Sequence, residues 1–121
     1  DIIIDCTDNF ETRFKIADDC QEYKKPYILG TVRAYEGQIT TILPSTLKIN
    51  NPKIRSLFNE ENTVNSLYDC SDEGILSITT TLVGTIMASE CLKIILDINE
   101  GLFGKLLMVD LLNLRFETIK Y

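Results

Sequence analysis

Apolar and polar positions at the start of the chain predict a strand followed by a helix. Three consecutive isoleucines within residues 1–5 form a continuous apolar run, typical of a strand that is covered on both faces in a parallel sheet. In residues 9–23 the apolar positions recur at helical spacing, and Asp8 and Glu11 are placed as an N-cap and a third helical residue. We therefore expect the first helix to follow the first strand almost directly.

Two further strands and a long connection are expected next. Residues 27–31 form a second buried apolar run. Residues 37–43 alternate well enough to be a third strand, for which antiparallel pairing with the second is one option. Residues 44–72 contain prolines, asparagines, serines and mixed charge with little periodicity, which predicts a long exposed connection.

The second half of the chain predicts a long helix and a closing hairpin. Apolar residues continue through most of residues 74–96, and we expect a buried helix there, because Glu90 and Lys93 interrupt the run before it is long enough to span a bilayer. Residues 105–110 and 114–120 are predicted to be the two strands of a terminal hairpin. This order of elements predicts one α/β domain with an open sheet, whose ligands gather at the carboxyl ends of the strands.

Composition and charge exclude several classes of function. A net charge of −6 and a pI near 4.6 leave no basic face for a phosphate backbone, so nucleic-acid binding is not expected. The absence of histidine excludes Ser–His and Cys–His nucleophile pairs. The four cysteines include no Cys-x-x-Cys pair and no signal peptide is recognisable, so we expect reduced thiols, a cytoplasmic location and no zinc site. Because residues 1–5 open within a predicted strand, we also expect the chain to be a fragment.

The segment with the clearest chemistry is Asp5-Cys6-Thr7-Asp8-Asn9, directly after the first predicted strand. It puts two carboxylates and a hydroxyl at the carboxyl end of a strand and just before a helix, where open α/β sheets hold phosphates and their magnesium. The alternative is that Asp8 is only a helix cap, because caps are far more common than metal ligands. The spacing alone leaves both interpretations open.

Several motifs occur in one collinear order along almost the whole chain. They are Asp5-Cys6-Thr7-Asp8-Asn9, Thr12-Arg13-Phe14, Lys25-Pro26, Glu36-Gly37-Gln38-Ile39-Thr40, Cys70 with Gly74-Ile75-Leu76, Gly104-Lys105-Leu106-Leu107 and Arg115-Phe116. In this order they resemble the C-terminal half of the adenylating domain of the ThiF/MoeB/HesA (E1-like) family, apart from roughly residues 44–69. The resemblance covers residues 1–121 as one domain half and implies a Rossmann-like open sheet with a closing antiparallel hairpin.

The same resemblance implies an ATP-dependent adenylyltransferase that uses magnesium. In this family the C-terminal Gly-Gly carboxylate of a ubiquitin-like sulfur-carrier protein of ThiS or MoaD type, serving thiamine or molybdopterin biosynthesis, attacks the α-phosphate of ATP. The magnesium-contacting aspartate of the family matches Asp8, and Asp5, Asn9 and Arg13 are the further candidate cofactor contacts. For Arg13, a solvated helix arginine is the alternative. Family members of this type are usually homodimers.

Among the cysteines, Cys70 is the candidate for catalysis. It resembles the family cysteine that attacks the acyl-adenylate or joins the carrier through a thioester or persulfide-type bond, and an ordinary loop thiol is the alternative. Cys6, Cys20 and Cys91 fall in or beside strand and helix patterns, so we expect them to be small core residues.

The sequence also departs from the family pattern. Lys53 and Ser56 stand where zinc-binding members have a Cys-x-x-Cys pair, and Ala17 stands where asparagine is usual. No glycine-rich phosphate-binding turn occurs in the 121 residues, so we expect this chain by itself to be inactive and not to bind ATP. Two alternatives stay open: a non-catalytic E1-like scaffold half, and an unrelated binding domain of dehydrogenase type.

Overall fold

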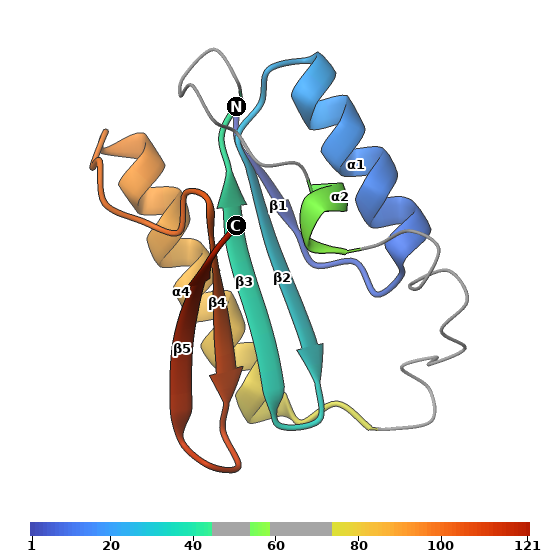
Figure 1. Cartoon of the computed structure of the whole chain (residues 1–121), viewed down its shortest axis with the longest axis vertical. Coiled ribbons are helices and arrows are strands. Elements are labelled where there is room, and N and C mark those ends of the chain that lie inside the picture. Colours follow the sequence, from blue (N-terminus) through green and yellow to red (C-terminus); the bar gives the residue numbers. More distant parts are fainter. Residues whose placement is uncertain (45–53, 59–73) are drawn as a thin grey trace.

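The described part of the chain forms a five-stranded sheet with helices on its two faces (Figure 1). The computed structural model describes residues 1–44, 54–58 and 74–121. The elements within these ranges are β1 (Ile3–Asp5), α1 (Phe10–Glu22), β2 (Tyr27–Arg33), β3 (Glu36–Ile42), α2 (Ile54–Leu57), α4 (Ser77–Ile95), β4 (Lys105–Asp110) and β5 (Arg115–Lys120). The predicted α/β class with an open sheet is confirmed.

The strands lie side by side in the order in which they occur along the chain. Among the described strands, only β1 and β2 pair in parallel, with Asp5 beside Leu29, because α1 carries the chain back between them. From β2 to β5 every pairing is antiparallel, which confirms the antiparallel option for the third strand and the closing hairpin. The segment after β1 therefore emerges at the carboxyl end of a parallel pair.

β2 separates two hydrophobic clusters, because successive side chains of a strand point to opposite faces of the sheet. Tyr27 packs on the face that holds Phe14 of α1. Ile28 packs on the other face with Met87 of α4. Figure 1 shows α1 and α4 on either side of the central strands. The packing of α1 fixes the position of the loop that precedes it.

β1 is less covered than its continuous apolar run predicted. Ile4 is 45% exposed and Ile3 is exposed as well, whereas Asp5 is buried. Within the described sheet β1 is an edge strand and has a neighbouring strand on one side only. The prediction of a strand buried on both faces is therefore wrong for these residues.

Part of the predicted exposed connection is folded. Ile54 of α2 is 2% exposed and belongs to the cluster of Phe14. The ring of Phe58, which follows α2, lies 5.3 Å from the ring of Phe10 between centroids. A single helical turn leaves no periodicity in a sequence, which is why the pattern did not predict it. Residues 45–53 and 59–73 of the predicted connection lie outside the described residues.

α4 is only half-buried, whereas we expected a buried helix. Val83 and Met87 face the sheet, whereas Ile78, Leu92 and Ile95 are exposed.

By length and composition alone α4 is apolar enough to cross a membrane, so the prediction that this run is too short is wrong. For a single helix that criterion is weak, because helices packed in a protein core satisfy it too, and α4 packs on β2 and β3.

Candidate functional site

The loop between β1 and α1 holds Asp5 in a buried position. The residue is 2% exposed. Its Oδ1 accepts hydrogen bonds from the backbone N–H of Thr7 at 2.8 Å and from the Thr7 hydroxyl at 2.7 Å. Its Oδ2 accepts a hydrogen bond from the Tyr27 hydroxyl. Both carboxylate oxygens of this predicted cofactor ligand are thus engaged within the protein.

Asn9, and not Asp8, caps α1. The side-chain Oδ1 of Asn9 accepts the backbone N–H of Thr12 at 2.9 Å, and the Asn9 backbone is extended, with φ −128° and ψ 148°. The capping role considered for Asp8 is therefore wrong. Aspartate and asparagine are about equally good N-caps, so the sequence could not separate two adjacent candidates.

Asp8 lies exposed between the buried Asp5 and the start of α1. Its Oδ1 accepts a hydrogen bond from the side-chain amide of Asn9 at 3.2 Å. Asp8 is therefore the carboxylate of this loop that a ligand in solvent can reach. Its place at the carboxyl end of β1 is the one at which open α/β sheets collect their ligands.

Arg13 is buried, which excludes the solvated alternative in this structure. Its Nε donates to the carbonyl oxygen of Thr7 at 3.1 Å, and its Nη2 donates to the same oxygen. The guanidinium carbon also lies 5.0 Å from the centre of the Phe10 ring, within the range of a cation–π contact. Arg13 thus ties α1 to the loop, and its contact with a nucleotide stays a prediction.

Tyr27 belongs to the same network and was not singled out from the sequence. It is 1% exposed at the start of β2, and burial, followed by its hydrogen bond to Asp5, raises the pKa of its hydroxyl. A buried tyrosine hydroxyl normally has a hydrogen-bond partner. The position of Tyr27 in a predicted buried strand was therefore the one signal that it takes part in a polar contact. Nothing in the sequence indicates that the partner is Asp5.

The donor set of the loop fits magnesium that is bound largely through phosphates. Within residues 1–44, 54–58 and 74–121, no group of three His, Cys, Asp or Glu side chains could hold a metal ion. Mg²⁺ usually keeps several waters and binds through one or two carboxylates together with substrate phosphates. The accessible carboxylate of Asp8 is the appropriate donor for such a site, which the phosphates of a nucleotide would complete.

The described cysteines only partly follow the predicted burial. Cys20 is buried, and burial raises the pKa of its thiol. Cys91 is half-buried. Cys6 is exposed, so its predicted core position is wrong, because the chain has already left β1 at this residue. Cys70 lies outside the described residues, and its role stays a prediction.

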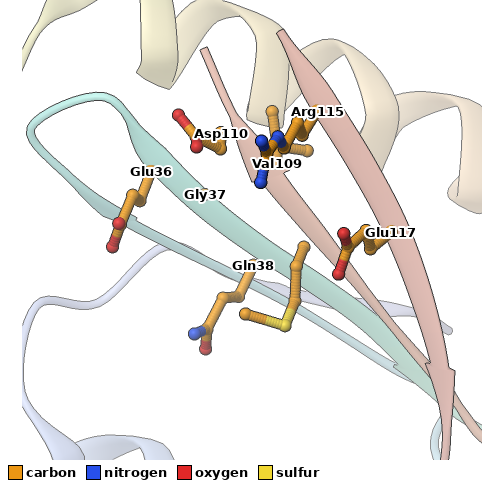
Figure 2. Close-up of a pocket in the computed structure, with 8 residues that line it drawn as sticks. Glu36, Gly37, Gln38, Val109, Asp110, Arg115 and Glu117 are labelled. Atoms are coloured by element: carbon orange, nitrogen blue, oxygen red, sulfur yellow. The ribbon is translucent and has the colours of Figure 1, made fainter. Parts of the chain in front are cut away.

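A hollow of about 220 Å³ lies on the sheet and not at this loop (Figure 2). It is lined by residues of β3, β4 and β5 that include both charge signs: Glu36, Gly37, Gln38, Met108, Val109, Asp110, Arg115 and Glu117. Figure 2 shows the side chains of Glu36 and Gln38 coming from one strand and those of Arg115 and Glu117 from another. The hollow shares no residue with the β1–α1 loop, so the predicted site residues do not line it.

The whole chain, residues 1–121, matches the ThiF family. It is 36% identical to the SAMP-activating enzyme E1 of Haloferax volcanii, over 100% of this chain and 43% of that protein. It is 38% identical to the probable molybdopterin-synthase adenylyltransferase of Porphyra purpurea, over 99% of this chain and 31% of that protein. Identity to the sulfur carrier protein adenylyltransferase of Thermus thermophilus is 31%, over 98% of this chain and 44% of that protein. The chain thus spans less than half the length of these curated relatives.

The fold is also similar to that of a solved structure. The crystal structure of Escherichia coli MccB with ATP superposes with a TM-score of 0.74 at 14% identity, over 99% of this chain and 36% of that one. At this identity the likeness concerns the fold alone. The family match over all 121 residues, together with the identity to these relatives, establishes that the chain belongs to the ThiF family.

Proposed function

We propose that this chain is part of an ATP-dependent adenylyltransferase that activates the C-terminal Gly-Gly of a ubiquitin-like sulfur-carrier protein. The observation that carries the proposal is the exposed Asp8 carboxylate at the carboxyl end of β1, beside the start of α1. Membership of the ThiF family and the names of the relatives support this class of reaction. The corresponding biological role is thiamine or molybdopterin biosynthesis.

The proposed reaction joins a carboxylate to a phosphate. A carboxylate oxygen of the carrier attacks the α-phosphorus of ATP, the bond from that phosphorus to the bridging oxygen breaks, and pyrophosphate leaves as the acyl-adenylate forms. Asp8 would hold Mg²⁺, which when bound neutralises charge on the departing pyrophosphate. The N-terminus of α1 adds partial positive charge beside the same loop. The chain thereby contributes the magnesium-binding part of the site.

The nature of the carrier is proposed from the relatives. The Haloferax volcanii protein is named for activating SAMP, and the Thermus thermophilus protein for adenylating a sulfur carrier protein. The Gly-Gly tail comes from the family that the motifs resemble, as does the homodimeric state that we also propose. A cytoplasmic location agrees with the free thiols of Cys6, Cys20 and Cys91, because disulfides are rare in that compartment.

Exchange of labelled pyrophosphate into ATP tests this function. The full-length protein that contains these residues would be incubated with ATP, Mg²⁺ and a carrier of ThiS or MoaD type, each with its C-terminal Gly-Gly intact or removed. We expect exchange with an intact carrier and background exchange with the truncated form. A full-length protein that binds either intact carrier but exchanges no pyrophosphate would contradict the proposal and favour the scaffold alternative.

A further inference from the structure

A buried chain of hydrogen bonds lies behind the loop that carries Asp8. Oδ1 of Asp5 accepts hydrogen bonds from the N–H and the hydroxyl of Thr7, and Oδ2 accepts one from the hydroxyl of Tyr27. Asp5 and Tyr27 are 22 residues apart in the sequence and come from the neighbouring strands β1 and β2. The contact therefore joins the end of one strand to the start of the next one.

Tyr27 is suited to supply a fixed donor. Its side chain packs with Phe14 and Leu29 in the cluster on the α1 face, so the position of its ring is set by packing. Burial and the neighbouring Asp5 carboxylate raise the pKa of the hydroxyl, which therefore keeps its proton and goes on donating. The Tyr27 side chain is buried, so its hydroxyl is not accessible to a ligand in solvent.

Both backbone polar groups of Thr7 form hydrogen bonds with side chains of this network. The N–H donates to Asp5 at 2.8 Å, and the carbonyl oxygen accepts from the Arg13 guanidinium. Asp8 is the next residue in the chain. Because the N–H and the carbonyl oxygen of Thr7 are both held, the backbone position of Asp8 is restricted as well. Catalytic and ligand-binding groups need such support to stay within a fraction of an ångström of their working position.

We propose that Asp5 and Tyr27 are positioning residues for Asp8, and that Asp5 is not itself a ligand of magnesium or nucleotide. The inference rests on the proposed function, and it replaces the expectation that Asp5 contacts the cofactor. A metal ligand must offer a lone pair toward the ion. The two oxygens of Asp5 accept three hydrogen bonds, which leaves about one of the four lone-pair sites of a carboxylate, and at 2% exposure that site is not open to a ligand in solvent.

Kinetics of the full-length protein separate the two roles of Asp5. The variants are Tyr27→Phe, Asp5→Asn and their combination, with Tyr23→Phe as a matched control, since Tyr23 is 68% exposed at the end of α1. Displacement of a reacting group by about 1 Å can cost roughly a hundredfold in rate. We expect Tyr27→Phe to lower kcat of pyrophosphate exchange by about tenfold or more and to raise the Mg²⁺ concentration for half-maximal rate, while KM for the carrier stays near that of the wild type.

The double variant tests whether the two side chains act together. Residues that share one interaction are non-additive, so the combination of Asp5→Asn and Tyr27→Phe should be little worse than the more damaging single change. If Asp5→Asn abolishes exchange while Tyr27→Phe behaves like Tyr23→Phe, Asp5 is a ligand and the inference is wrong. Thermal unfolding of each variant ensures that rates are compared between folded proteins.

Hydrogen exchange of the Thr7 amide gives a readout that does not depend on activity. We expect the Thr7 amide to exchange faster in Tyr27→Phe than in the wild type or in Tyr23→Phe. Without the Tyr27 hydroxyl, Asp5 loses one of its hydrogen bonds and holds the Thr7 N–H less firmly. Unchanged protection of Thr7 would overturn the inference whatever the kinetics. A wild-type protein that exchanges no pyrophosphate would overturn the proposed function and the catalytic part of this inference, and the Thr7 amide would still decide whether Tyr27 holds the loop.

Discussion

The side-chain oxygen of Asn9 accepts the backbone N–H of Thr12 at 2.9 Å, so the start of α1 is held by Asn9 and not by its neighbour Asp8. Loss of an N-cap costs about 1 kcal/mol, whereas a charge near an exposed helix N-terminus contributes only about 0.5 kcal/mol. Asn9→Ala should therefore lower the free energy of unfolding more than Asp8→Ala does. Urea unfolding of both variants measures the difference, and a larger loss for Asp8→Ala would restore the capping role of Asp8.

Glu90 ties α4 to the sheet and to the following loop. The residue is 1% exposed, and its Oε2 accepts the Thr41 hydroxyl at 3.1 Å and the Leu102 N–H at 2.8 Å. Its Oε1 lies 2.5 Å from Nζ of Lys93. Glu90→Ala leaves these groups without their acceptor, so we expect a loss of about 3 kcal/mol in the free energy of unfolding.

The exposed Glu100 provides the matched control for that change, because it lies just beyond α4 and its carboxylate is in solvent. Glu100→Ala should change the free energy of unfolding by less than about 0.5 kcal/mol. Equal effects of the two substitutions in chemical denaturation would mean that the buried contacts of Glu90 do not hold α4 in place.

Two glycines should respond in opposite directions to alanine. At Gly30 of β2 a Cβ atom would run into Sδ of Met87 and lie 3.0 Å from Cγ1 of Val83, so Gly30→Ala should destabilise the protein by about 1–3 kcal/mol. At Gly84 on the exposed side of α4 a Cβ atom meets nothing within 4 Å, and alanine should stabilise the helix by up to about 1 kcal/mol. A calorimetric melting series compares the two, and a stabilised Gly30→Ala would show that α4 does not pack against β2 as described.

The 121 residues by themselves should not bind ATP. Their sequence contains Asp8 but no glycine-rich turn to hold the phosphates, and a single carboxylate does not retain Mg-ATP. Calorimetric titration of the folded chain with Mg-ATP should give only heats of dilution. Binding in the micromolar range would contradict this expectation and place further nucleotide contacts within these residues.

The fold was predictable where it depends on local patterns. The apolar run that begins at Tyr27 indicated β2, although the strand continues two residues beyond the predicted Thr31, to Arg33. The hairpin formed by β4 and β5 was predicted to within one residue. β2 was predicted from a short continuous apolar run, and the hairpin from two strand-like segments near the end of the chain; both are local features that a single sequence displays.

The candidate site was less predictable, because its contacts join residues that no local pattern connects. Asp5 reaches Tyr27 on the next strand, and Arg13 turns back to the carbonyl of Thr7. Asparagine and aspartate cap helices about equally well, so residue type does not distinguish Asn9 from Asp8. The cap is Asn9 because its extended backbone places it directly before the first helical residue. Burial of Ile54 follows from a single helical turn packed on α1, which has too few residues to show a period.

In the proposed function, Asp8 serves the adenylation reaction and not the fold. The most direct measurement is carrier-dependent pyrophosphate exchange by the full-length Asp8→Asn protein over a range of Mg²⁺ concentrations, with Glu22→Gln as control, because Glu22 is an exposed carboxylate at the other end of α1. We predict that Asp8→Asn loses activity by about a hundredfold or more, the usual effect of removing a group that stabilises transition-state charge, while Glu22→Gln stays within a few-fold of the wild type. Exchange by Asp8→Asn at the wild-type rate throughout the Mg²⁺ range would contradict the claim.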